Sequence, residues 1–224
     1  TWRVSAFWLQ PLQNRVALAI ADRSAVGIVR SAALAVALRQ LAPDTRVVVR
    51  PVVSTFGEPV LSPEEVTERD PQRWVICGGT ELVRRSLRSF PGAGELFVVG
   101  GADSPEIRQQ LDAAHYLPEV VAATASGILA ESAFGWIDYF ETLDVPMAAV
   151  LKSTTFAAYC AHGVIPVFPA ATSTIAEGLP GPFTMANLPS ASARPAIALA
   201  IYEWYRAHAS SAQLAATVSE ALAS

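Results

Sequence analysis

The sequence predicts an α/β protein with mostly parallel sheets. Short apolar runs rich in β-branched residues alternate with segments whose apolar residues recur at helical spacing, which is the pattern of alternating strands and helices. One stretch rich in Pro, Glu, Ser and Thr, residues 54–73, interrupts this alternation, so we expect two successive α/β series joined by a linker. With 224 residues, of which 52% are hydrophobic, the chain can bury one or two cores.

The first series occupies residues 1–53. Leu34, Leu38 and Leu41 recur at helical spacing and mark its central helix. In chain order, the expected elements are a helix at 12–24, a strand at 25–31, a helix at 32–43 and a strand at 45–53.

The second series occupies residues 74–224, and several of its helices have marked ends. Thr80 is expected to cap the first helix, while Ser104 as N-cap and Pro105 at the first helical position mark the second. A helix at 153–162 begins with Ser and Thr hydroxyls and is followed by Gly163. The expected strands are 74–79, 95–101, 115–118, 134–139 and 164–168, and the expected helices are 80–90, 104–114, 118–132, 153–162, 194–209 and 211–222.

Composition and charge exclude several classes of protein. The net charge of −4, without a basic stripe, argues against a nucleic-acid partner, and no apolar run reaches the eighteen residues of a transmembrane segment. Thr1 is not an initiator methionine and no signal peptide follows it, which is compatible with a start inside a longer polypeptide. Cys77 and Cys160 lack metal-ligand spacing and are expected to be small buried hydrophobes, which suits a reducing, cytoplasmic compartment.

Three turns of the second series are suited to a ligand, because open parallel sheets bind ligands beyond the carboxyl ends of their strands. Two of these turns carry paired glycines, which let the backbone approach a ligand closely. The three turns contain Gly78, Gly79 and Thr80, then Gly100 and Gly101, and then Lys152, Ser153, Thr154 and Thr155.

The turn from Lys152 to Thr155 has the chemistry of a diphosphate site. A helix start presents unpaired N–H groups and the positive end of the helix dipole, and its hydroxyls donate hydrogen bonds. Lys152 adds a full positive charge, and it is the single lysine among 16 basic side chains. Two plainer interpretations stay open: Ser and Thr are ordinary helix caps, and one surface lysine can persist by chance.

Other nucleotide and metal chemistries have little support in the sequence. Neither glycine turn supplies the G-x-G-x-x-G fingerprint of dinucleotide oxidoreductases, and no Walker A sequence is present. The three histidines, His115, His162 and His208, form no metal pattern.

Four charged residues near these turns have two interpretations each. Asp138 and Glu141 lie at and just after a predicted strand, where a carboxylate would either bind sugar or ribose hydroxyls or lie solvated in a loop. Arg84 and Arg85 would either reach a phosphate or belong to a solvated helix face.

The order CGGTELVRRSLRSF, ELFVVGG, HYLPEVV, ILAESAFGWIDYFE and KSTTFAAYCAHGVIPV resembles the C-terminal, donor-binding domain of GT-B glycosyltransferases, particularly the group-4-like bacterial enzymes. FAAYCAHGVIPV is similar to the end of that family's segment E-x-x-G-x-x-x-x-E-A-x-A-x-G-x-P-V, although the second glutamate is missing here. The resemblance covers about residues 71–224 and implies Rossmann-like sheets of the GT-B type. Residues 1–70 resemble the end of the N-terminal, acceptor-side domain.

The resemblance implies a metal-independent transferase that needs no cofactor and uses a nucleotide diphosphate sugar as its donor. The acceptor would be an unidentified glycan or lipid-linked molecule, which is compatible with polysaccharide biosynthesis in bacteria and with peripheral association at the inner membrane face. By position, it places the donor diphosphate near Gly78, Gly79 and the Lys152–Thr155 turn, the base near Tyr116 and Leu117, and a sugar or ribose contact at Glu141.

Two other functions stay open at this point. One is a degenerate, non-catalytic domain that binds a nucleotide or sugar, or acts as a scaffold in polysaccharide biosynthesis. The other is a nucleotide-sugar epimerase, which would need catalytic acids that the sequence does not reveal.

Overall fold

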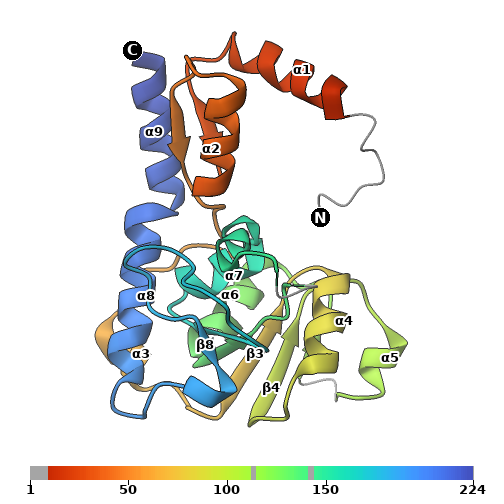
Figure 1. Cartoon of the computed structure of the whole chain (residues 1–224). Coiled ribbons are helices and arrows are strands. Elements are labelled where there is room, and N and C mark those ends of the chain that lie inside the picture. The colour runs from red at the N-terminus through yellow and green to blue at the C-terminus, as the bar shows by residue number, and fades with distance from the viewer. Residues whose placement is uncertain (1–9, 112–114, 141–143, 224) are drawn as a thin grey trace. The chain divides into compact units, whose positions relative to one another are not determined.

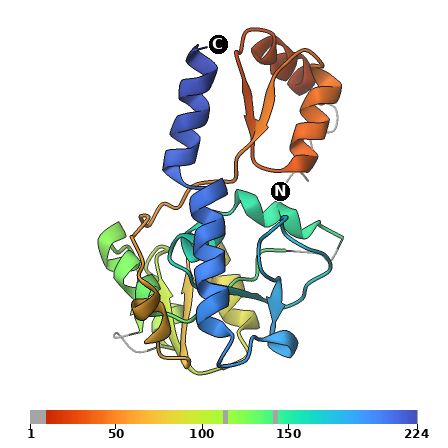
Figure 2. The ribbon, with the colours of Figure 1, turned by 90° about the vertical axis from the view of Figure 1, so that its left-hand side faces the viewer.

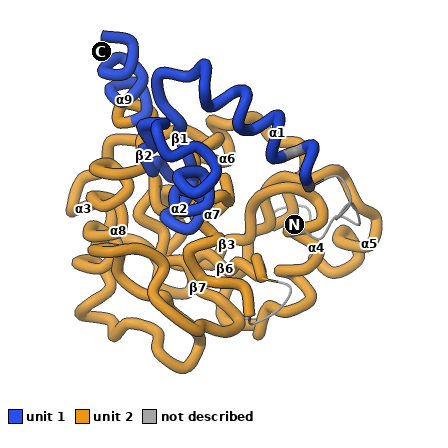
Figure 3. The backbone as a smooth tube through the Cα atoms, turned by 45° about the horizontal axis from the view of Figure 1, so that its top comes forward, with its two compact units in different colours: residues 1–51, 214–224 blue, residues 52–213 orange. Residues whose placement is uncertain are grey.

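The computed structural model describes residues 10–111, 115–140 and 144–223 (Figure 1 and Figure 2). Contacts divide the chain into two compact units, the first made of residues 1–51 and 214–224 and the second of residues 52–213 (Figure 3). The chain therefore leaves the first unit after Pro51 and returns to it within its last helix. Residues 54–73, predicted to be a linker, lie inside the second unit.

The first unit has the predicted order of helix, strand, helix and strand. Its elements are α1 (Gln10–Ala21), β1 (Gly27–Val29), α2 (Ala32–Leu41), β2 (Val47–Val49) and the end of α9 (Ser211–Ala223). The two strands pair in parallel. A Cβ at Gly27 would lie 2.7 Å from Cδ2 of Leu38, so the glycine lets α2 pack closely on β1. The Arg50 Nε–H donates to Thr217 Oγ1 at 2.9 Å, which fixes α9 to the end of β2.

The second unit contains a six-stranded sheet surrounded by helices. Its strands are β3 (Arg73–Cys77), β4 (Glu95–Val99), β5 (Tyr116–Leu117), β6 (Phe134–Trp136), β7 (Ile165–Phe168) and β8 (Phe183–Thr184). Its helices are α3 (Pro63–Thr67), α4 (Thr80–Ser89), α5 (Pro105–Arg108), α6 (Ala122–Glu131), α7 (Thr154–Ala161) and α8 (Arg194–His208), with two 3-10 helices, η2 (Met147–Lys152) and η3 (Met185–Asn187).

The strand order is β5-β4-β3-β6-β7-β8, and every strand pair among the described residues is parallel. This confirms the predicted α/β class. The central strands are nearly continuous apolar runs because a parallel sheet is covered on both faces. Residues 74–77 of β3 and all of β6 and β7 are buried.

Helix α7 lies in the interior of the second unit. Every residue from Thr155 to Ala161 is buried, as expected for a helix that is apolar on all sides. Its N-cap is Ser153, and it ends just before Gly163, whose φ of +60° suits a glycine at this position. Both predicted ends are therefore confirmed. α8 packs against α7, α3 and β7 (Figure 2).

One local prediction was wrong, and two others are refined. The stretch 54–73 contains α3, whose first turn is fixed by a capping box between Ser62 and Glu65. Thr80 does not cap α4, because Gly79 occupies the N-cap position and Thr80 is the first helical residue. At α5, Ser104 is the N-cap residue and Pro105 the first helical residue, as predicted, although the Ser104 hydroxyl makes no capping hydrogen bond.

His162, at the C-terminal end of α7, gives a pH-dependent stability. Its Nδ1 lies 2.8 Å from the Ala158 carbonyl oxygen and its Nε2 lies 2.8 Å from Ser126 Oγ, so the neutral ring is fully hydrogen-bonded. Burial lowers the pKa of His162 below its ordinary value, and the unfolded chain therefore binds this proton more readily than the folded one.

Stability should therefore be complete above the ordinary histidine pKa of about 6.5 and should fall as the pH drops below it, by up to about 1 kcal/mol at pH 5.5. Urea unfolding at several pH values measures this slope. The variant His162→Gln should flatten the slope, whereas His208→Gln, at an exposed position, should leave it unchanged. Equal slopes in all three proteins would contradict this account.

Candidate functional site

The candidate site lies where the order of the strands reverses. From β3 the chain adds β4 and β5 on one side, and from β6 it adds β7 and β8 on the other, so β3 and β6 are neighbours although they are distant in sequence. We call the carboxyl ends of β3 and β6, with the turns that follow them, the switch point. Open α/β sheets bind their ligands at this position.

The two strands of the switch point separate early. Their pairing covers Trp74 with Phe134 and Val75 with Gly135. On its other side, β3 stays paired with β4 as far as Cys77. The last two residues of β3 therefore have no strand partner on the β6 side and need other hydrogen-bond partners.

Tyr159 of α7 supplies one such partner, at Cys77, and bonds to two main-chain oxygens beside it. Its buried hydroxyl accepts a hydrogen bond from the Cys77 N–H at 3.2 Å and shares its proton between the carbonyl oxygens of Val75 and Trp136, at 3.1 and 3.0 Å. The aromatic ring passes over Gly135, where a Cβ would lie 2.6 Å from the ring. Tyr159 thus acts as a wedge between the two strands.

A second side chain of α7, one helical turn earlier, contacts the same residue of β3. The Thr155 hydroxyl donates to the Cys77 carbonyl oxygen at 3.1 Å. It also lies against Gly78, where a Cβ would collide with it. The start of α7 and the turn after β3 are therefore in direct contact, and the structure brings together two of the predicted turns.

The two paired-glycine turns also touch each other. A Cβ at Gly100 would lie 2.9 Å from the Gly78 carbonyl oxygen, and a Cβ at Gly101 would lie 3.2 Å from the Cα of Thr80. Gly78, Gly100 and Gly101 have φ values of +126°, +88° and +73°. Both the close approach and the backbone conformation favour glycine at these positions.

The start of α4 is open to a ligand. A Cβ at Gly79 would meet nothing within 4 Å, and no side chain caps this helix end. The first N–H groups of a helix have no partner inside the helix, so those of α4 are available to an anion. The Thr80 hydroxyl accepts a hydrogen bond from Ala102 N–H at 2.8 Å, which leaves its own proton to donate.

The start of α7 carries the other predicted groups. Lys152 is half-buried at the end of η2, and none of the ion pairs among the described residues involves it. Ser153 is buried, and its hydroxyl accepts from the Phe156 N–H at 3.3 Å while keeping its proton. Thr154 is exposed. Thr155 is buried and its proton is already donated to Cys77, so it holds the turn rather than pointing at solvent.

Asp138 follows β6 and is held in place by α4. Its N–H donates to Ser86 Oγ at 3.0 Å, and its carbonyl oxygen accepts from Arg85 Nε at 2.6 Å. The Arg85 Nε also lies 3.6 Å from the Asp138 carboxylate. Arg85 therefore bonds to the loop after β6, whereas the ion pair that Arg84 forms within the described ranges is a long, exposed contact of 3.9 Å with Glu106.

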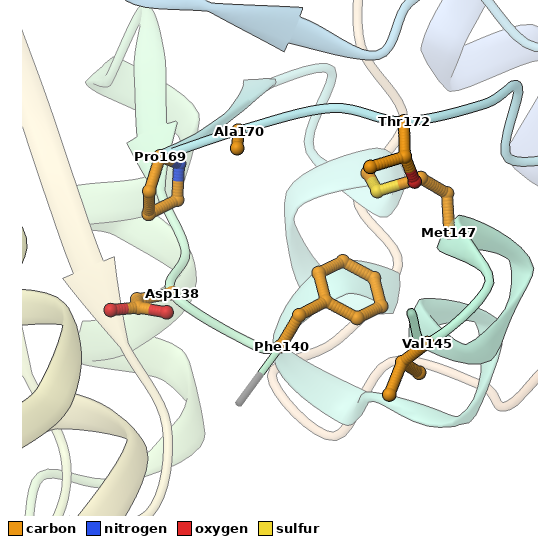
Figure 4. A pocket seen from close by; sticks show the side chains of 7 residues that line it. All are labelled: Asp138, Phe140, Val145, Met147, Pro169, Ala170 and Thr172. Carbon is orange, nitrogen blue, oxygen red and sulfur yellow. The ribbon is translucent and has the colours of Figure 1, made fainter. Parts of the chain in front are cut away.

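A small pocket lies beyond the carboxyl ends of β6 and β7 (Figure 4). Its volume is about 50 Å³, and its lining is mainly apolar with a single carboxylate. The residues that line it are Asp138, Phe140, Val145, Met147, Pro169, Ala170 and Thr172. This volume is far below the 300–1,000 Å³ that is typical of pockets enclosing a whole ligand.

Three predicted residues remain. Tyr116 and Leu117 form β5, at the edge of the sheet and two strands away from β3. The Tyr116 hydroxyl bonds within the protein, accepting from Ser104 N–H at 3.0 Å and donating to the Ala102 carbonyl oxygen at 3.1 Å. Glu141 lies outside the described residues.

Neither cysteine is suited to act as a nucleophile. Both are buried and free, as predicted, and burial raises the pKa of the Cys77 thiol to about 12. Burial raises the pKa of Cys160 as well. In the described part of the chain, His, Cys, Asp and Glu form no group of three or more that could hold a metal ion. No helix in that part has the length and apolar character needed to cross a membrane.

Comparison with known proteins identifies the fold. Neither a known protein-family profile nor a curated protein matches the sequence. Among solved structures, Anabaena HepE in complex with UDP and glucose is similar with a TM-score of 0.58 and 16% identity, over 96% of this chain and 67% of that one. The pneumococcal O-GlcNAc transferase GtfA in complex with UDP and GlcNAc has a TM-score of 0.52 and 12% identity, over 90% of this chain and 46% of that one.

These likenesses show the fold, which is that of GT-B glycosyltransferases with their Rossmann-like parallel sheets. The fold that the sequence predicted by resemblance is therefore confirmed. The chain spans about half the length of GtfA.

The glycine turn gives a direct test of this geometry. Gly78→Ala should destabilise the second unit by about 2 kcal/mol or more, because its Cβ would collide with Thr155 and its φ is positive. Gly79→Ala is the matched control: its φ of −73° is ordinary and its surroundings are open, so its stability should stay within about 0.5 kcal/mol of the wild type. Chemical denaturation measures both, and equal losses would contradict the described contact.

Proposed function

We propose that this chain supplies the donor-binding part of a glycosyltransferase, which transfers a sugar from a nucleotide diphosphate sugar to a glycan or lipid-linked acceptor. One observation carries the proposal. The contact of Thr155 with Cys77 and Gly78 joins the open, glycine-rich start of α4 to the start of α7, which follows Lys152 directly, at the switch point of a parallel sheet.

The groups at this junction match the charge of a diphosphate. Two helix starts, those of α4 and α7, present N–H groups and the positive ends of their dipoles. Lys152 adds an ammonium without a carboxylate partner among the described residues, and Ser153 and Thr80 keep hydroxyl protons to donate. When the bond between the sugar and the diphosphate breaks, negative charge grows on the diphosphate, and fixed donors and cations stabilise it.

The two solved structures support the choice of donor. HepE and GtfA share this fold and were both solved with UDP, one with glucose and the other with GlcNAc. UDP is therefore the first nucleotide to test on this chain.

Several finer roles belong to the same proposal. Glu141 would contact a sugar or ribose hydroxyl, and the base would lie near Tyr116 and Leu117, next to the second glycine turn. Transfer would be metal-independent, with the Lys152 ammonium taking the part that a divalent cation plays elsewhere. The enzyme would act in bacterial polysaccharide biosynthesis, in the cytoplasm or at the inner face of the membrane.

Lys152 is the residue whose loss should weaken nucleotide binding most clearly. Lys152→Ala should reduce the affinity for UDP about tenfold or more, because a charge-assisted hydrogen bond to a phosphate contributes about 1.5–3 kcal/mol. Isothermal titration calorimetry measures the change. Arg88→Ala is the control, because it removes the same charge from an exposed position in the last turn of α4 and should leave the affinity unchanged. Equal binding by Lys152→Ala and the wild type would remove the proposed role.

Turnover separates the transferase from the alternative function, a non-catalytic nucleotide- or sugar-binding domain or scaffold. Incubation of the full-length protein with UDP-glucose and UDP-GlcNAc, in the presence of chelator, should release UDP by slow hydrolysis or by transfer to an added acceptor. Tight UDP binding without turnover of any nucleotide sugar would favour the non-catalytic domain. Turnover that requires added divalent metal would contradict the metal-independent mechanism.

A further inference from the structure

We propose that Tyr159 is a positioning residue for the diphosphate and that it acts through Cys77 on the turn formed by Gly78 and Gly79. This inference rests on the proposed function. The tyrosine itself lies in the interior, behind the switch point, and its side chain is fully buried, so it would not touch the ligand.

The separated strands need hydrogen-bond partners for their main-chain groups. Beyond Val75 and Gly135, β3 and β6 no longer pair, and the main-chain groups that they would have shared are buried. The single hydroxyl of Tyr159 serves two of these groups, the Cys77 N–H and the Trp136 carbonyl oxygen, and it also donates to the carbonyl oxygen of Val75, the last paired residue of β3. A buried main-chain group without a partner is costly, so the hydroxyl is what makes the separation stable.

Tyr159 is connected to the glycine turn through Cys77. Thr155 and Tyr159 lie four residues apart on one face of α7, and between them they hold both the carbonyl oxygen and the N–H of Cys77. Cys77 is the last residue of β3, so these two bonds fix the peptide from which Gly78 and Gly79 start. The same helix begins with the Ser153–Thr155 segment, directly after Lys152. The wedge therefore sets the distance between the two groups of donors that would bind the diphosphate.

The contacts of Tyr159 differ from those of an aromatic side chain that only fills a core. An aromatic ring in a core needs no hydroxyl, yet here the oxygen makes contacts on both sides of a strand gap. The ring also occupies the space above Gly135, where any side chain would be within 2.6–2.7 Å of three ring atoms. Shape and hydrogen bonding thus both place this tyrosine between the two strands.

Tyr159→Phe tests the proposal, because it keeps the ring and removes only the hydroxyl. UDP affinity, measured by calorimetry on the intact chain, should fall about tenfold, since the turn would lose one of its two fixed bonds. Hydrogen–deuterium exchange of the amides at residues 76–79 should become faster in the same variant.

The control is Tyr205→Phe. Tyr205 is also fully buried, and its hydroxyl also bonds to a main-chain N–H and another group, Ser54 at 2.8 Å and the Glu58 carboxylate at 2.6 Å, but these lie outside the switch point. This variant should lose comparable stability while keeping the affinity for UDP and the slow exchange at residues 76–79. Equal loss of affinity in both tyrosine variants would show that general destabilisation is the cause and would overturn the proposal.

Two further outcomes are decisive. If Tyr159→Phe does not fold, Thr155→Val removes the other bond to Cys77, and it should weaken UDP binding and speed exchange at the same amides; unchanged binding and exchange would overturn the proposal. If the wild type binds none of UDP, GDP or ADP, the proposed function is wrong. Amide exchange alone then tests whether Tyr159 fixes Cys77. Slow exchange at Cys77 in Tyr159→Phe would then overturn it.

Discussion

The switch point depends on the two hydrogen bonds by which side chains of α7 fix Cys77. The main-chain groups of a parallel strand buried between two neighbours normally form hydrogen bonds with both of them. The pairing of β3 with β6, however, ends two residues before the end of β3, while its pairing with β4 continues. Tyr159 and Thr155 take over that side, so the strand can end in a fixed direction while the sheet opens beside it. This arrangement is close-packed, and at Gly78, Gly100 and Gly135 it leaves no space for a Cβ.

The same helix is fixed at its other end by a different device. The guanidinium of Arg69 donates to the carbonyl oxygens of His162 and Gly163, at 2.7 and 2.8 Å, and so occupies acceptors that a helix end leaves free. Burial lowers the pKa of Arg69 only to about 10, so it stays charged at neutral pH and favours the negative end of the helix dipole. The positive end, at Ser153, is left facing the switch point. The helix is therefore anchored by a cation at one end and open to an anion at the other.

Periodicity and end signals were enough to predict most of this architecture. Buried parallel strands are short apolar runs, and the caps Ser153 and Gly163 are local features, so both can be recognised without tertiary information. The wedge could not be predicted, because Tyr159 lies in the apolar run FAAYCA and only its spacing of four from Thr155 hints at a shared face. The bond from Arg85 to the loop after β6 was missed as well, since a partner 53 residues away leaves no trace in local sequence. The hydrogen bonds by which the Tyr116 hydroxyl holds the turn after β4 were likewise not predicted, because they join the residue to a turn more than ten positions away.

The hydroxyl protons that are already used inside the protein determine which hydroxyls could donate to a diphosphate. A hydroxyl has one proton, and Thr155 donates its proton to the Cys77 carbonyl oxygen, so the hydroxyls of this turn that keep a proton for a ligand are those of Ser153 and the exposed Thr154. Thr80 keeps its proton because it accepts from Ala102 N–H instead. The main-chain N–H groups at the start of α4 are not capped by any side chain, and Gly79 leaves their approach open. Recognition would therefore rest chiefly on backbone N–H groups and one ammonium, which bind the phosphates of any nucleotide alike. Selectivity for a base must come from residues outside this junction.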